Sequence, residues 1–238
     1  MKALAVALVR WCVPNPEWWP QAMPVQAFDR ILCKTHESLR LFEAITDKAE
    51  LVGFTARDRY IADVPRERAF LHVAGKSIMK GTDAILAAWK QFHIDQPLTI
   101  VSSSRFKESI PGVRYLDWLD DAALKSEQNR NLFYLAPSQT EGYGHSLHEA
   151  ASCGAVIARS EWSPMDEVPG VSMHAEAGRP MRLARTCRVS SGAIRDAVES
   201  CLAMDGGQIV ALRAKTRESY VRERAAFESR FLHLLATI

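Results

Sequence analysis

Residues 136–150, with the sequence APSQTEGYGHSLHEA, place two carboxylates around a short glycine-rich segment. Glu141 precedes Gly142-Tyr143-Gly144, and Glu149 follows it within an apolar, helix-forming run. Glycines let backbone N–H groups approach a ligand closely, and the start of a helix favours negative charge. Carboxylates accept hydrogen bonds from hydroxyl groups. The segment therefore predicts a site for a ligand that is both anionic and rich in hydroxyls.

A second glycine-bounded segment, residues 75–81, carries two lysines. It begins with Gly75-Lys76 and ends with Lys80-Gly81, directly before a predicted helix. Two ammonium groups beside a helix N-terminus suit a diphosphate. The alternative is a pair of solvated surface lysines, and the presence of the first segment favours the diphosphate interpretation.

The helix after Gly144 offers a competing metal site. His145, His148 and Glu149 are spaced i, i+3 and i+4, which places them on one helix face. The spacing differs from the H-E-x-x-H pattern of zinc proteases. We favour a hydrogen bond from His145 to the ligand and a packing role for His148, while Tyr143 suits either ligand contact or packing.

The elements that position these residues alternate between apolar runs and helix-forming stretches. Since strands alternating with helices indicate a doubly wound parallel sheet, we expect an α/β fold whose ligand loops meet beyond the strand C-termini. The expected strands are residues 3–9, 27–33, 49–53, 69–74, 98–102, 113–116, 131–136, 155–158 and 183–189. The expected helices are residues 37–45, 82–92, 121–128, 146–153, 191–204 and 207–235.

A polar, charged stretch at residues 54–68, with Pro65 near its end, predicts a linker. We therefore expect a small α/β part at residues 1–66 and a Rossmann-like domain at residues 67–238. In the first part, three prolines between Val13 and Pro20 predict an irregular, rigid loop. This loop either lines a cleft or forms an aromatic lid over the sheet edge, and its candidate ligand-facing residues are Asn15, Glu17 and Trp18.

Composition excludes several classes of protein. The chain has 238 residues and a net charge of only +2, which argues against a large nucleic-acid footprint. Its five cysteines are widely spaced and form no CxxC pair, which favours reduced thiols in a cytoplasmic protein. No apolar run approaches the length of a membrane span. We read the apolar N-terminus as a buried strand rather than a signal peptide.

The two glycine-bounded segments, in this order, resemble the donor-binding half of retaining GT-B glycosyltransferases, most closely glycosyltransferase family 4. Glu141 and Glu149 match the E-x7-E motif of that family, and Gly154-Ala-Val-Ile157 matches the strand after it. The resemblance covers about residues 68–225. Residues 13–18 and 32–35 look like the end of the acceptor half in related enzymes.

The resemblance implies a role for each matching residue. The donor diphosphate would be bound by the segment that contains Gly75, Lys76, Lys80 and Gly81. The backbone of Gly142, Tyr143 and Gly144 would approach the sugar and the distal phosphate, with His145 nearby. Glu141 would contact sugar hydroxyls near the reacting carbon, and Glu149 would accept hydrogen bonds from the ribose 2′- and 3′-hydroxyls. Such enzymes need no metal cofactor, and their substrate is a nucleotide-diphosphate sugar such as a UDP- or GDP-sugar.

The implied activity is retaining transfer of a sugar to an unidentified acceptor, which can be a glycan, a lipid, a protein or a nucleic acid. Most of the acceptor half is missing, and Lys76 stands where relatives usually carry arginine. We therefore expect a partner subunit, a homo-oligomer or a large docked acceptor to complete the site. The alternative is a non-catalytic nucleotide-sugar-binding or interaction module. The basic last helix is expected to pack against residues 3–45 as a solvated, ion-paired helix. The alternative is a basic face for anionic membranes, in a membrane-peripheral role, or for nucleic acid.

Overall fold

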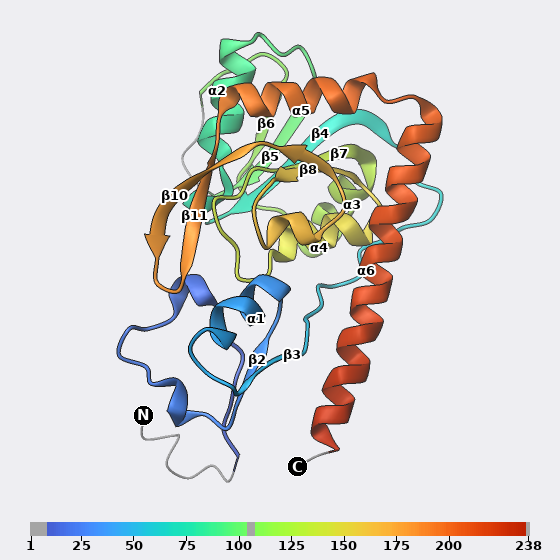
Figure 1. Cartoon of the computed structure of the whole chain (residues 1–238). Coiled ribbons are helices and arrows are strands. Elements are labelled where there is room, and N and C mark those ends of the chain that lie inside the picture. The colour runs from blue at the N-terminus through green and yellow to red at the C-terminus, as the bar shows by residue number, and fades with distance from the viewer. Residues whose placement is uncertain (1–8, 104–107, 237–238) are drawn as a thin grey trace.

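The computed structural model describes residues 9–103 and 108–236 (Figure 1). The strand expected at residues 3–9 lies almost wholly outside them. The first unit is a small parallel sheet in the order β1-β2-β3, with one helix and two single 3-10 turns. Its elements are β1 Trp11–Cys12, β2 Arg30–Cys33, α1 His36–Glu43 and β3 Ala49–Leu51, with 3-10 turns at Pro16–Trp18 and Val25–Ala27.

The second unit contains a six-stranded sheet in the order β6-β5-β4-β7-β8-β9, in which all pairings are parallel. This arrangement confirms the doubly wound fold. Strand order reverses between β4 and β7, and loops that leave neighbouring strands on opposite sides open a crevice at such a point. The strands are β4 Glu67–Gly75, β5 Leu98–Ser102, β6 Val113–Leu116, β7 Asn131–Ala136, β8 Val156–Ser160 and β9 Val171–Met173.

Helices cover both faces of this sheet, so its central strands are largely buried and mostly apolar. One face packs against α2 Thr82–Gln91 and α5 Ser191–Ala203. The other packs against α3 Asp121–Arg130, α4 His145–Ser152 and α6 Gly206–Leu235. At the centre, Phe70 of β4 stacks on Phe133 of β7 with ring centroids 4.7 Å apart.

At the point where the strand order reverses, the buried His72 of β4 forms hydrogen bonds with both β7 and α2. Burial lowers the pKa of His72 to about 4, so its ring is neutral. Its Nδ1 donates to the carbonyl of Leu135 at 2.8 Å, and Nε2 therefore accepts from the hydroxyl of Thr82 at 3.0 Å. This interaction fixes the ends of β4 and β7, from which the two predicted ligand loops depart.

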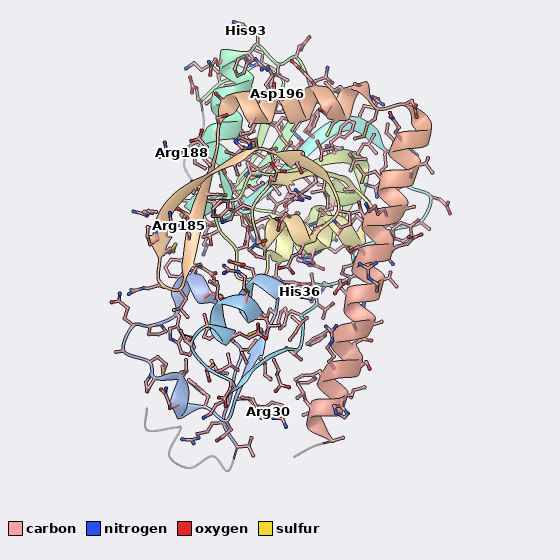
Figure 2. All side chains as sticks on the ribbon, viewed as in Figure 1. Arg30, His36, His93, Arg185, Arg188 and Asp196 are labelled. Carbon is pink, nitrogen blue, oxygen red and sulfur yellow. The ribbon has the colours of Figure 1, made fainter. Side chains whose placement is uncertain are left out.

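The strand expected at residues 183–189 is not part of the parallel sheet. It forms β11 Ala184–Val189 and pairs antiparallel with β10 Ala175–Met181, which the sequence analysis missed together with β9. β10 contains Gly178 and Pro180, two residues that disfavour strands, and most of its side chains are exposed. Arg185 and Arg188 lie on this hairpin (Figure 2), which reaches the first unit through Leu183 N–H and the carbonyl of Pro16.

Helix α6 runs from the second unit back along the first (Figure 1). Its N-terminus has a capping box between Asp205 and Gln208. Near its end, Leu234 packs against Leu32 and Val52, which confirms that the last helix packs against the first unit. Among the described residues, no helix is both long enough and apolar enough to cross a membrane.

Candidate functional site

A cleft of about 360 Å³ opens where the sheet order reverses. The turn after β4 and the glycine-rich loop after β7 form one side, which brings together the two segments singled out by the sequence. The first unit forms the other side. The cleft is lined by Asn15, Glu17, Lys34, Val73, Ala74, Gly75, Lys80, Glu141, Gly142, Tyr143, Gly144, His145 and Ser146.

An ion pair connects the two loops inside the cleft. Lys80 Nζ lies 2.5 Å from Glu141 Oε1 and donates to Ser146 Oγ at 3.2 Å. The side chains of Lys80 and Glu141 are only 15% and 12% exposed, so the pair is shielded from solvent. The backbone N–H of Gln139 also donates to the carbonyl of Met79 at 2.8 Å. The lysine, the carboxylate and the first turn of α4 are therefore held together before any ligand binds.

Two glycines allow close approaches that a side chain would block. A Cβ at Gly142 would lie 2.3 Å from Asn15 Oδ1 and 2.8 Å from Glu17 Oε1, so the first unit packs directly on this loop. Gly81 has φ +75°, and a Cβ there would lie 2.2 Å from the carbonyl oxygen of Pro137. Gly81 therefore lets the two loops pack against each other and does not line the cleft.

The first turn of α4 is shaped by aromatic packing. Tyr143 stacks on His148 with ring centroids 3.9 Å apart and donates to the carbonyl of Phe54 at 3.2 Å. His148 Nδ1 donates to the carbonyl of Gly144, and burial lowers the pKa of His148 to about 4. His145 is exposed at the cleft, and partial desolvation lowers its pKa.

The alternative metal site has no support in this geometry. His148 is engaged in packing, and the carboxylate of Glu149 is held by other residues. In residues 9–103 and 108–236, no group of three histidine, cysteine or acidic side chains is arranged to hold a metal ion.

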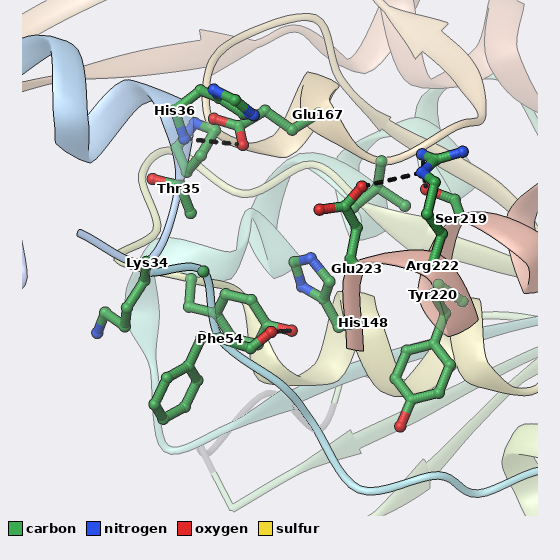
Figure 3. Close-up of a pocket in the computed structure, with 15 residues that line it drawn as sticks. Lys34, Thr35, His36, Phe54, His148, Glu167, Ser219, Tyr220, Arg222 and Glu223 are labelled. Atoms are coloured by element: carbon green, nitrogen blue, oxygen red, sulfur yellow. Dashed lines mark hydrogen bonds and ion pairs between the residues drawn. The ribbon is translucent and has the colours of Figure 1, made fainter. Parts of the chain in front are cut away.

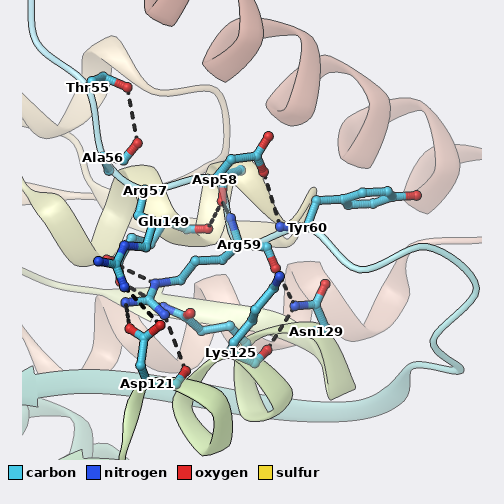
Figure 4. Close-up of polar contacts among 12 residues, drawn as sticks. Thr55, Ala56, Arg57, Asp58, Arg59, Tyr60, Asp121, Lys125, Asn129 and Glu149 are labelled. Atoms are coloured by element: carbon cyan, nitrogen blue, oxygen red, sulfur yellow. Dashed lines mark hydrogen bonds and ion pairs between the residues drawn. The ribbon is translucent and has the colours of Figure 1, made fainter.

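Glu149 does not line the cleft, although it lies one helical turn after His145. Its Oε1 lies 3.0 Å from Arg59 Nε, and its Oε2 accepts from Gln128 Nε2 at 3.0 Å. Arg59 belongs to the linker, is 6% exposed and also pairs with Asp121 at 2.9 Å (Figure 4). The linker is anchored further by Asp58, which forms a two-pronged ion pair with Arg217 of α6.

Two other predicted site residues lie outside the cleft. Trp18 is 63% exposed, and Lys76 is exposed on the turn after β4; neither lines the cleft. The prolines also permit a 3-10 turn at Pro16–Trp18, contrary to the expected irregular loop, because proline is compatible with the first position of a helical turn. That turn points Trp18 outward while burying Glu17.

Glu17 has an unusual environment for a carboxyl group. It is 5% exposed, and its Oε2 is buried without a hydrogen-bond partner. Burial raises its pKa, the nearby charge of Glu141 raises it further, and Lys34 opposes the shift. Sequence analysis assigned no role to Lys34, although its position directly after β2 is a strand C-terminus, where ligands of parallel sheets bind.

A second cavity, of about 280 Å³, lies between α1, the linker, α4 and α6 (Figure 3). Glu167 stands at its edge and accepts the backbone N–H groups of His36 and Glu37 at 3.1 and 3.0 Å. This carboxylate of the second unit therefore satisfies donors in the first turn of α1. The contact helps to fix the orientation of the first unit, to which His36 belongs (Figure 2).

No family model matches this chain, and no curated protein sequence matches it. Several solved structures, however, are similar to it. The sucrose-phosphate synthase of Thermosynechococcus elongatus is 17% identical, with a TM-score of 0.66 over 89% of this chain and 59% of that one. Anabaena HepE in complex with UDP and glucose is 10% identical, with a TM-score of 0.69 over 96% and 71%. The GtfA/B complex is 14% identical, with a TM-score of 0.63 over 89% and 46%.

This chain therefore spans between 46% and 71% of the lengths of these three proteins. At such identities, the similarity establishes the fold. The chain has the Rossmann-like GT-B fold that these glycosyltransferase structures share.

Proposed function

We propose that this chain carries the donor site of a retaining glycosyltransferase that uses a nucleotide-diphosphate sugar. The observation that carries the proposal is the Lys80–Glu141 pair, which joins a cation of the turn after β4 to a hydroxyl acceptor of the glycine-rich loop after β7, at the point of strand reversal. Two proteins with this fold support the choice of donor. One is HepE, solved in complex with UDP and glucose. The other is an E. coli protein whose structure is reported as trehalose-6-phosphate bound with UDP-2-fluoro glucose.

The diphosphate would lie between the turn after β4 and the start of α4. Lys80 supplies a cation, Gly75 leaves room for a phosphate, and the first turn of α4 presents backbone N–H groups without a side-chain cap. Lys76 adds positive charge at the rim. Because these groups are prearranged to stabilise the charge that develops on the leaving diphosphate, the proposed reaction needs no metal cofactor.

Glu141 would accept hydrogen bonds from sugar hydroxyls next to the anomeric carbon. In the transfer step, the bond from the anomeric carbon to the diphosphate oxygen breaks, and the electron pair leaves with the diphosphate. The acceptor oxygen forms its bond on the same face of the sugar, and its proton passes to the departing diphosphate. Lys80 is placed to bind that phosphate and to orient Glu141 at the same time.

We assign Glu149 to the ribose 2′- and 3′-hydroxyls. Its Oε1 keeps the ion pair with Arg59, and the ribose would replace Gln128 as the hydrogen-bond donor to Oε2. This assignment follows the match of Glu141 and Glu149 to the E-x7-E motif of glycosyltransferase family 4.

The acceptor would enter from the side of the first unit. Asn15 and Glu17 stand there, against Gly142. Since the chain spans only part of the length of the proteins that share its fold, we propose that a partner chain, a second copy or a large acceptor completes this side.

The test is release of nucleoside diphosphate from a panel of UDP-, GDP- and ADP-sugars, measured with purified protein and candidate acceptors. If the acceptor is absent from the assay, slow transfer of the sugar to water would still release the nucleoside diphosphate. We expect release from at least one donor in the presence of EDTA, with loss of release in the Glu141→Gln variant. Saturable nucleotide binding without release would identify a binding module instead. No binding at all would overturn both functions.

A further inference from the structure

Lys34 of the first unit points an ammonium group at the cleft without an acidic partner. It follows the last residue of β2 and lines the cleft opposite the glycine-rich loop. Its Nζ donates to the neutral Oδ1 of Asn15, the atom that packs against Gly142. Among the described residues, no carboxylate lies within ion-pair distance of this nitrogen.

Lys80, the other lysine of the cleft, differs in this respect. Its charge is balanced by Glu141 at 2.5 Å, so the pair contributes little net charge. Lys34 also borders the second cavity, which is lined by Glu167 and Glu223. In Figure 3 its ammonium points away from both of them. The side chain is therefore directed to the cleft rather than to the acids of the neighbouring cavity.

The printed partners of the Lys34 charge are neutral groups, because its Nζ, besides its bond to Asn15, lies 5.6 Å from the centroid of the Phe54 ring in a cation–π contact. Lys34 is half-buried, and desolvation lowers its pKa, which shows that its surroundings penalise the charged form. Burial of a cation is offset by an anion with hydrogen-bonding oxygens. Glu17, which also lines the cleft, raises the pKa of Lys34 at longer range, and burial raises the pKa of Glu17 itself. Lys34 thus presents a cation on the acceptor side of the cleft that is not directly ion-paired, whereas Lys80 is.

We propose that Lys34 is a phosphate-binding residue, which meets the donor diphosphate from the first unit while Lys80 meets it from the second. The inference rests on the proposed function, because it takes a nucleotide-diphosphate sugar as the ligand of the cleft. It adds a residue from the acceptor side to the donor site. Binding of the diphosphate would then also draw the two units together across Gly142.

The test compares the affinity of variants for UDP, GDP and ADP, measured by isothermal titration calorimetry in EDTA, with uridine, guanosine and adenosine as uncharged probes. For Lys34→Gln we expect the dissociation constant of the bound diphosphate to rise about tenfold, the loss of one charge-assisted hydrogen bond. Affinity for the nucleoside should not change. Lys34→Arg, which keeps the charge, should recover most of the affinity.

Lys48→Gln is the matched control. Lys48 precedes β3 and lies at the opposite end of the strands of the same parallel sheet, where its Nζ donates to the carbonyl of Phe28 at 2.8 Å, so its replacement removes one charge outside the cleft. If wild type binds no nucleoside diphosphate, the proposed function fails. If wild type binds one and Lys34→Gln binds it equally well, only the role of Lys34 is overturned. An equal loss in Lys48→Gln would also overturn it, because the effect would then be one of net charge.

Discussion

The two glutamates of the E-x7-E pattern stand in different surroundings. Glu141 lies in the loop after β7, faces the cleft and pairs with Lys80 of the neighbouring loop. Glu149 lies one turn into α4, outside the cleft lining, and pairs with Arg59 of the linker. Their side chains are similarly shielded, at 12% and 15% exposure, so burial does not distinguish them.

The difference lies in what their partners do. Lys80 is itself a candidate ligand group, so the pair in the cleft can be shared with a substrate. Arg59 is nearly buried and joins Glu149 to Asp121, and therefore fastens the linker across the second unit. In the proposed function, this pair of glutamates supplies one carboxylate for substrate contact and one that also fastens the linker to the second unit.

Replacement of Glu141 should have the largest effect. Glu141→Gln keeps the side-chain shape but removes the charge that pairs with Lys80 and that, in the proposed function, accepts hydrogen bonds from sugar hydroxyls. We expect turnover to fall about a thousandfold, in the range seen for loss of a preorganised electrostatic contact. Steady-state release of nucleoside diphosphate measures this, and an unchanged urea midpoint is the control. If Glu141→Gln and Glu149→Gln lost equal turnover, the proposed difference in role between the two glutamates would be wrong.

Replacement of Arg59 should mainly lower stability. Arg59→Gln leaves Glu149 buried without its cation, and we expect a loss of about 3 kcal/mol in the free energy of unfolding. Lys80→Gln should cost less, because Lys80 faces the open cleft. Urea unfolding of both variants makes the comparison. If Lys80→Gln proved the more destabilising, the cleft pair rather than the linker pair would be the structural one.

Glu149→Gln should separate ribose binding from phosphate binding. We expect the affinity for a nucleoside diphosphate to fall about tenfold through loss of a charged hydrogen-bond acceptor. Affinity for inorganic pyrophosphate, which has no ribose, should stay the same. Calorimetric titration with both probes is the measurement. Parallel losses for both would show that Glu149 acts through the linker and not on the ribose.

The smallest effect should be a pH dependence from Glu17. Burial raises its pKa above the usual 4.5, so the folded state holds this proton more tightly than the unfolded state. That contribution to stability is fully present below pH 4.5 and is lost as the pH rises through the folded-state pKa. Glu17→Gln should therefore gain in urea midpoint over wild type as the pH rises toward neutrality. A constant difference at all pH values would contradict the raised pKa of Glu17 in the folded state.

The sequence predicted most of the second unit because its central strands are mostly apolar and its loops carry glycine at the turns. It missed β9 and β10, which are short or mostly exposed and leave no periodic pattern. It singled out Lys80 and Glu141 from their glycine-bounded segments and the family resemblance, and the structure brings these two side chains together in one cleft. It gave no sign of Arg59 or Lys34, since their importance comes from contacts over long chain distances, with Glu149 and with the loop around Gly142.

The central claim is that the nucleotide-diphosphate sugar binds at the glycine-rich loop after β7. The most direct measurement is an NMR titration of isotope-labelled protein with the nucleoside diphosphate that binds most tightly. The account predicts that the largest amide shift changes fall on residues 75–81 and 141–146. Changes concentrated around the second cavity, near His36 and Glu167, or no site-specific changes at saturating ligand, would contradict it.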